Sequence, residues 1–179
     1  MTRALSAALL LLLVAGCAPA AGHGGSTARP DGRMVLVSGR DDHGYEVAAR
    51  VPLFDGPAST TRVGTVADGT LAHVQEIHGS WLHVVTAEGV PVDGWVDDFS
   101  LRGVVHLVGP APSCRASLDG HPVEGGLQVV VRQVMGSRVQ VTGVADPTLR
   151  GWTTRDAVQE LPPQGARCGE DPLGTGHHH

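Results

Sequence analysis

The chain has 179 residues, of which 41% are hydrophobic and 17% charged, so the composition is that of a globular protein rather than a disordered one. This length suits one ordinary domain or two very small ones. The formal net charge is −5 and no cluster of arginines offers a face to phosphates, which argues against nucleic acid as a partner. Aromatic residues are the usual anchors of a recognition surface. Five of the six lie within the first 100 residues: Tyr45, Phe54, Trp81, Trp95 and Phe99.

The N-terminal segment has the features of a secretory signal. A single positive charge, Arg3, precedes an apolar run over residues 4–15, which is shorter than the ~20 residues that span a bilayer. The run ends in Leu-Val-Ala-Gly directly before Cys17, which resembles the lipobox of bacterial lipoproteins. The resemblance implies that residues 1–16 are a signal peptide and that Cys17 becomes a diacylated N-terminus, anchored at the extracytoplasmic face of the bacterial cell membrane. A plain signal peptide followed by a chance cysteine is the alternative.

Residues 17–33 are predicted to be a flexible tether between the lipid anchor and the globular part. They are small, polar and rich in Ala, Gly and Pro, so they cannot bury a core. Such a tether is what a module displayed at a membrane surface needs.

The first predicted strands flank a polar turn. A short apolar run predicts a strand over residues 34–38, and a second strand is expected over residues 45–53. Between them, Asp41, Asp42 and His43 suggest a metal or acid–base site. However, adjacent residues on one turn rarely converge on a single ion, so a solvated turn is the favoured interpretation and no metal site is predicted.

The stretch from Gly69 to Leu101 recurs without a gap 57 positions later, over residues 126–158. The matches fall on turn glycines and on alternating valines, as a β-meander requires, so we infer one small β-module that is used twice. The matched pairs are Gly69/Gly126, Val74/Val131, Gly79/Gly136, Ser80/Ser137, Val84/Val141, Gly94/Gly151 and Trp95/Trp152.

A hairpin is predicted in the middle of the first copy. Its alternating apolar residues keep one face only if the loop has three residues, 77–79, with glycine last. This register would place His73 opposite His83, and Gln75 opposite Trp81, all on the outer face. Two facing histidines would make only a weak metal site. An exposed indole is costly to leave in water and commonly marks a binding surface.

The two copies differ where recognition is expected. Arg138 stands in the second copy where Trp81 stands in the first, and Asp156 stands where Phe99 stands. Trp152 repeats Trp95, and such shared positions are interpreted as the barrel itself. We therefore predict that the first copy binds and that the second is its rigid support.

Two cysteines lie in the later part of the chain. Outside the cytoplasm paired cysteines usually form disulfides, so Cys114 and Cys168 are predicted to be bridged. The bridge would close a loop of about 55 residues, worth about 4 kcal/mol in the chain-entropy model. A catalytic Cys114 working with His121 is the alternative, but no orienting acid is evident. Residues 169–179 are expected to form a disordered tail.

Several motifs follow one another in a characteristic order between residues 51 and 101. They are Val-Pro-Leu-Phe-Asp-Gly-Pro (51–57), Val-Gly-Thr-Val (63–66), Gly-Ser-Trp-Leu-His-Val (79–84), and Gly-Trp-Val (94–96) with a helical turn before Leu101. In this order they resemble a bacterial SH3 domain, and the second copy resembles it weakly. The resemblance implies an all-β chain with two tandem small SH3-like barrels, over residues 34–103 and 104–168.

The resemblance also implies a site and a function. The family mostly binds peptides, often of the cell wall, in a groove that would here be flanked by Phe54, Asp55, Trp81, Asp97, Asp98 and Phe99. We therefore expect a non-catalytic cell-envelope lipoprotein whose first SH3-like domain binds peptide or peptidoglycan-associated ligands. The alternative is a structural lipoprotein that docks onto a partner envelope protein. Neither Gly-x-Ser-x-Gly, His-Glu-x-x-His nor a phosphate loop occurs in the sequence, so no catalytic residue and no cofactor is predicted.

Overall fold

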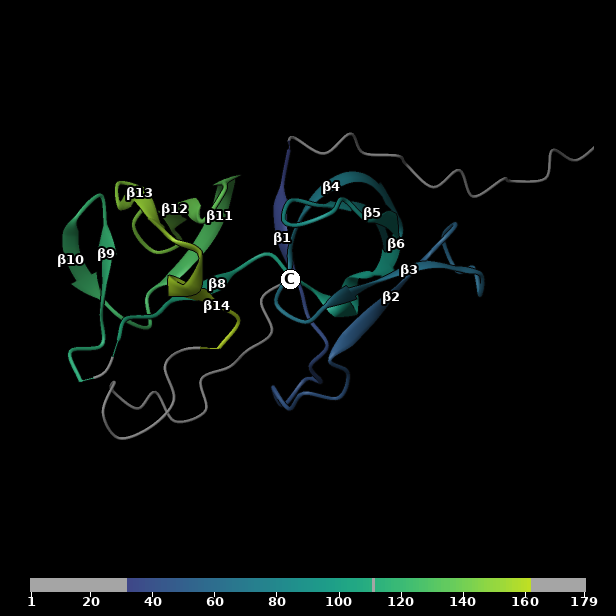
Figure 1. Cartoon of the computed structure of the whole chain (residues 1–179), viewed down its shortest axis with the longest axis horizontal. Helices are drawn as coiled ribbons and strands as arrows, with labels where there is room; N and C mark the ends of the chain where they lie inside the picture. Colours follow the sequence, from purple (N-terminus) through teal and green to yellow (C-terminus); the bar gives the residue numbers. More distant parts are fainter. Residues whose placement is uncertain (1–31, 111, 162–179) are drawn as a thin grey trace, which may run out of the picture.

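The computed structural model describes residues 32–110 and 112–161, which form β-strands, turns and two short 3-10 turns (Figure 1). The predicted all-β fold is confirmed, since no α-helix occurs within these two ranges. In the same part of the chain, no helix is long and apolar enough to cross a membrane. We call residues 32–103 the first module and residues 104–161 the second module.

The first module is one curled antiparallel sheet of seven strands (Figure 1). Its strand order is β3-β2-β6-β5-β4-β1-β7, and a 3-10 turn, η1 (Asp98–Ser100), joins β6 to β7 at the predicted position of a helical turn. Inward-facing valines and leucines alternate with outward-facing residues and fill the curl. The strands are β1 (Met34–Val37), β2 (Arg50–Phe54), β3 (Arg62–Ala67), β4 (Leu71–His78), β5 (Trp81–Thr86), β6 (Asp93–Asp97) and β7 (Leu101–Arg102).

The second module contains a five-stranded sheet of order β13-β12-β11-β8-β14 and a separate two-stranded hairpin, β9–β10. A second 3-10 turn, η2 (Arg155–Ala157), joins β13 to β14. The strands are β8 (Val105–Leu107), β9 (Arg115–Leu118), β10 (His121–Glu124), β11 (Gln128–Met135), β12 (Arg138–Gly143), β13 (Arg150–Thr154) and β14 (Val158–Gln159).

The internal repeat predicted from the sequence is visible in the strand bounds. Every element from β4 to β7 recurs 57 residues later as β11 to β14, with the 3-10 turn in the same place. Even a β-bulge recurs, between Val74 and Glu76 in the first copy and between Val131 and Gln133 in the second. The initial hairpins differ, because β2 pairs with β6 whereas β9–β10 stands as its own small sheet.

The predicted register of the β4–β5 hairpin is wrong. The bulge at Gln75 shifts the pairing, and the turn has two residues, Gly79 and Ser80, with Gly79 at a φ of +62°. His73 therefore pairs with Val85 rather than with His83. The facing histidine pair does not form.

The strand predicted over residues 45–53 begins later than expected. Only its second half is extended, as β2, while residues 45–49 form a loop held by a β-bridge between Arg40 and Glu46 and by backbone hydrogen bonds to Gly39 and Asp68. The apolar side chains that suggested a strand there are not buried: Tyr45 is 71% exposed and Val47 is 68% exposed.

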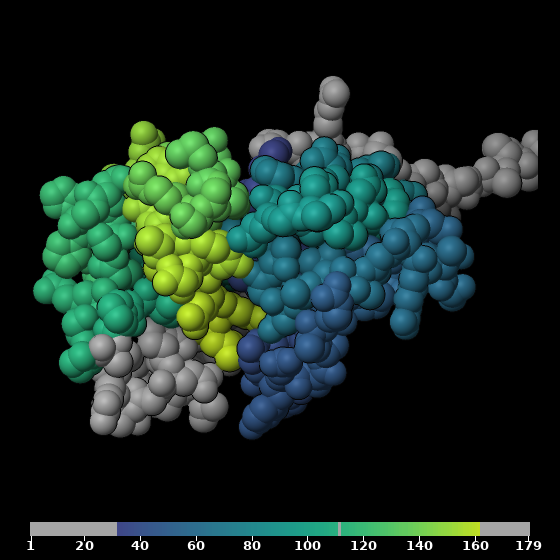
Figure 2. Space-filling view, in the orientation of Figure 1, coloured from purple at the N-terminus to yellow at the C-terminus, as the bar shows by residue number. Residues whose placement is uncertain are grey.

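Strand β1 belongs to two cores at once. Val35 and Val37 point into the first module, whereas Met34 and Leu36 point into the core of the second module, and all four are buried. Leu71 on the neighbouring β4 joins them on the second side. The modules therefore pack directly on one another, and Figure 2 shows the yellow end of the second module lying against the first.

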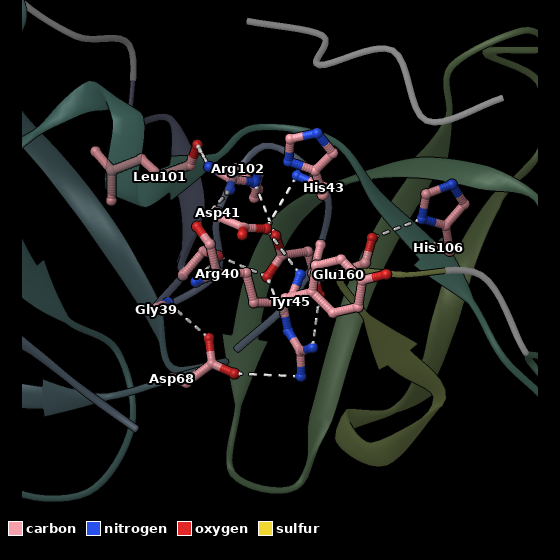
Figure 3. Close-up of polar contacts among 12 residues, drawn as sticks. Gly39, Arg40, Asp41, His43, Tyr45, Asp68, Leu101, Arg102, His106 and Glu160 are labelled. Carbon is pink, nitrogen blue, oxygen red and sulfur yellow. Dashed lines mark hydrogen bonds and ion pairs between the residues drawn. The ribbon is translucent and has the colours of Figure 1, made fainter. Parts of the chain in front are cut away.

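A polar network at the same junction converges on Glu160 of the second module (Figure 3). Its carboxylate accepts hydrogen bonds from Arg102 Nε at 2.8 Å and from Ser38 Oγ at 2.7 Å, and Arg40 Nε lies 3.6 Å away. The ring of His106 is bonded to the Glu160 carbonyl. Three first-module side chains thus share one second-module carboxylate.

A second ionic contact between the two modules lies near the start of strand β4. Arg155 Nε donates to Glu88 Oε1 at 2.6 Å, and the same guanidinium donates to the carbonyls of Gly69 and Val158. The other carboxylate oxygen of Glu88 accepts from the backbone N–H of Leu71 at 2.9 Å. These bonds hold η2 against the first module.

Candidate functional site

The outer face of three adjacent strands, β2, β6 and β5, gathers the aromatic residues of the first module. Along β5 and β6 buried residues alternate with half-exposed ones, so Trp81, His83 and Trp95 all point outward. Phe54 ends β2 and pairs directly with Trp95. We call Phe54, Trp81, His83 and Trp95 the aromatic face.

The side chains of the aromatic face contact one another in two pairs. The rings of Phe54 and Trp81 meet edge to face, with centroids 5.8 Å apart and an interplanar angle of 83°. The rings of His83 and Trp95 lie 5.2 Å apart at 32°. Each ring is partly exposed, so the pairs present fixed apolar area to solvent.

Two aspartates contact or pair with residues of this face, and two more follow its residues in the chain. Asp97 is the cross-strand partner of Trp81, and Asp93 binds His83 Nε2 through Oδ1 at 2.8 Å. Asp55 follows Phe54 in the chain, and Asp98 opens η1. The carboxylates of Asp55 and Asp98 are exposed and have no hydrogen bond or ion pair within the described ranges.

Two predicted site residues also have a structural task at the end of β6. Asp97 caps η1, since its Oδ1 accepts from the backbone N–H of Phe99 at 3.1 Å and its Oδ2 from Ser80 Oγ at 3.3 Å. The carbonyl of Phe99 accepts a hydrogen bond from Arg102 Nη1 at 2.6 Å, and the Phe99 side chain is 48% exposed. The 3-10 turn is thereby held beside Trp81.

Of the predicted site residues, the structure thus brings Phe54, Trp81 and Asp97 together, with Asp98 and Phe99 on the adjoining turn. Asp55 is next to Phe54 in the chain, but its side chain makes no contact with the others that the structure records.

Trp95 was not among the predicted site residues, because a position that both copies keep was interpreted as part of the barrel itself. The structure places it on the outer face, between the buried residues Gly94 and Val96. The alternation of inward and outward residues along the predicted strand would have placed Trp95 on the outer face. Gly94 itself is needed for close packing, because a Cβ there would lie 2.8 Å from Leu53 Cβ.

The second module carries different chemistry at the equivalent positions. Trp152 takes the place of Trp95, and Arg138 takes the place of Trp81, with its guanidinium 5.5 Å from the Trp152 ring centroid. Asp119 meets the backbone of Trp152 as Phe54 meets that of Trp95. Arg138 and Asp119 form an ion pair at 3.7 Å. An aromatic pair in one copy thus corresponds to a salt bridge in the other.

The charges of the two modules also differ. The first module has ten acidic residues and five arginines, whereas the second has five of each. The formal negative charge of the described residues therefore belongs to the module that holds the aromatic face.

The turn with Asp41, Asp42 and His43 does bring three potential metal ligands within 4.8 Å of one another. However, Asp41 Oδ1 already accepts the backbone N–H groups of His43 and Tyr45, at 3.0 and 2.9 Å. His43 Nδ1 lies 2.7 Å from Asp42 Oδ1. These contacts are those of a hydrogen-bonded surface turn.

The other predicted site residues are the three cysteines. Cys114 is buried and takes part in a disulfide. Its predicted partner, Cys168, and the predicted lipidation site, Cys17, both lie outside the described residues.

Comparison with protein-family models, with curated proteins and with solved structures gave no match for this chain. Functional inference therefore rests on the geometry above.

Proposed function

We propose that this chain is a non-catalytic lipoprotein of the bacterial cell envelope whose first module, an SH3-like domain, binds peptide. The lipobox-like segment before Cys17 supports anchoring at the extracytoplasmic face of the membrane. The observation that carries the binding proposal is the aromatic face, where half-exposed rings are held in fixed pairs by their neighbours. Preformed aromatic area of this kind binds ligands with little loss of side-chain freedom.

The charge of this face favours a ligand with a positive group. Asp55 directly follows Phe54 in the chain and Asp98 directly follows Asp97, and both have exposed carboxylates without hydrogen-bond or ion-pair partners among the described residues. A lysine-like or other amino-bearing side chain would gain from both, since cations are attracted to aromatic faces and to carboxylates. Wall peptides that carry a free amino group, or a basic segment of an envelope protein, have this chemistry.

The contacts of His83 hold part of the aromatic face in place. Its Nε2 is bonded to Asp93 Oδ1 at 2.8 Å, and its ring centroid lies 5.2 Å from that of Trp95. The pair therefore fixes the position of the Trp95 indole.

A sedimentation assay with purified peptidoglycan tests the proposal. We expect the full chain to be retained and Trp81→Ala to lose most of the retention, about tenfold or more for an aromatic anchor. Tyr45→Ala, which removes a ring that is 71% exposed and outside the face, is the matched control and should behave like wild type. Equal retention of wild type and Trp81→Ala would contradict the proposal.

A scaffolding lipoprotein that docks onto a partner envelope protein is the second candidate, favoured by the direct packing of the two modules on one another. Proximity labelling in cells that yields one dominant protein neighbour, unchanged when wall material is digested, would favour this candidate over wall binding.

A further inference from the structure

The second module has a hollow on its outer surface that the first-module proposal does not use. It lies between the β12–β13 face, the β9–β10 hairpin and η2, and Gly120 and Gln159 are on its rim. Side chains able to engage a ligand line it: Arg115, Ser117, Arg138, Trp152, Thr154 and Asp156.

The internal repeat shows that this hollow is the counterpart of the aromatic face. Arg138, Trp152 and Asp156 stand 57 positions after Trp81, Trp95 and Phe99. The two copies therefore place different side chains on the same face of the same fold. The second copy keeps one indole, Trp152, and has the charged residues Arg138 and Asp156 where the first has Trp81 and Phe99.

The guanidinium of Arg138 is positioned for a ligand. Its Cζ lies over the Trp152 ring, 5.5 Å from the ring centroid, and about half of the side chain is exposed to solvent. Its contact with Asp119, at 3.7 Å, is longer than a hydrogen bond. A carboxylate can form two parallel N–H···O bonds with such a group.

Arg115 supplies a second positive charge at the same hollow. Its side chain has no hydrogen bond or ion pair within the described part of the chain, although Glu124 is its cross-strand neighbour. The hydroxyl groups of Ser117 and Thr154 add neutral donors. The acids nearby, Asp119 and Asp156, limit the negative charge that the site accepts and disfavour polyanions.

We propose that this hollow binds a peptide through a single carboxylate, held by Arg138 and Arg115 with Trp152 as the apolar floor. The carboxylate is either a peptide C-terminus or an acidic side chain, since both offer the same two oxygens. The site is independent of the aromatic face, so the protein would contact two different peptide groups with its two copies.

Titration of the full chain followed by NMR tests this site. The three tryptophan indole N–H signals are assigned by single Trp→Phe variants, and three acetylated tripeptides are compared. These are Ala-Ala-Ala with a free carboxylate, the same peptide as the carboxamide, and Ala-Glu-Ala as the carboxamide.

We expect the free-carboxylate peptide to shift the Trp152 signal and the Ala-Ala-Ala carboxamide to bind about tenfold more weakly. A response to the Ala-Glu-Ala carboxamide would identify side-chain carboxylates as the source, and its absence a C-terminus. Arg138→Gln and Arg115→Gln should each weaken binding, whereas Trp81→Ala should leave it unchanged.

Three results would overturn the proposal: equal affinity for the carboxylate and carboxamide forms of Ala-Ala-Ala, unchanged binding in Arg138→Gln, or shifts confined to Trp81 and Trp95. Loss of wall retention in Trp81→Ala is measured separately, so failure at one face is distinguishable from failure at the other.

Discussion

The ring of Phe54 meets the ring of Trp81 nearly at right angles, with their centroids 5.8 Å apart, on the outer face of the first module. The equivalent positions of the second module hold Asp119 and Arg138 at 3.7 Å. One backbone frame thus supports two different pairwise interactions.

Double-mutant cycles should separate these two interactions. For Phe54→Leu and Trp81→Leu we expect a coupling free energy of about 0.5–1.5 kcal/mol, the range for edge-to-face pairs. For Asp119→Asn and Arg138→Gln we expect less than about 1 kcal/mol, because both side chains are half exposed. Urea unfolding of each set measures the coupling. A larger value for the charged pair than for the aromatic pair would contradict this assignment.

Substitutions in β1 should affect the whole chain. Leu36 is fully buried in the core of the second module although its strand belongs to the first sheet. We expect Leu36→Ala to lower the free energy of unfolding by about 2–5 kcal/mol and to leave a single transition. Val35→Ala, whose side chain faces the other core, is the matched control and should shift the same transition. Two separate transitions, with each variant lowering only one, would show that the modules unfold independently.

The junction carboxylate should be costly to remove. Glu160→Ala would leave the partly buried guanidinium of Arg102 without its counterion, and we expect a loss of about 3 kcal/mol in urea unfolding. Glu160→Gln keeps the shape and an acceptor oxygen, so its loss should be smaller. A loss below about 1 kcal/mol for the alanine variant would contradict this prediction, because that is the contribution of an ordinary solvent-exposed ion pair.

One carboxylate has a shifted acidity. The Thr148 hydroxyl donates to Asp146 Oδ1 at 2.6 Å and its backbone N–H donates to the same oxygen at 2.9 Å, which lowers the pKa of Asp146. Its folded pKa is below its unfolded pKa, so the stabilisation is present above the unfolded value and is lost as pH falls through the folded value. NMR titration of the carboxyl carbon should show the pKa of Asp146 rising towards its ordinary value in Thr148→Val. An unchanged pKa would mean that the hydroxyl is not its main cause.

The repeat made much of the fold predictable from the sequence. Turn glycines and alternating valines located β4 to β7 and β11 to β14, and the outward position of Trp81 followed from the same alternation. The register did not follow, because the bulge residues, Gln75 and Arg132, are exposed side chains of ordinary type that leave no mark on the apolar pattern.

Only part of the candidate site was predicted from the sequence. Phe54, Trp81 and Asp97 lie together as expected, but Trp95, which both copies keep, was interpreted as part of the barrel framework rather than of the binding face. His83 and Asp93 lie diagonally across the β5–β6 pair, and the sequence pattern did not identify this contact. One wall of the hollow in the second module is the β9–β10 hairpin, which lies outside the repeated segment. Comparison of the two copies therefore did not predict the hollow.

Strand β1 has no solvent-facing side, and this affects any shortened form of the protein. A fragment ending near residue 103 would keep all seven strands of its sheet but would uncover Met34, Leu36 and Leu71 as a continuous apolar stripe. Such a stripe next to a sheet edge favours self-association. Proteolytic removal of the second module would therefore yield a fragment that self-associates.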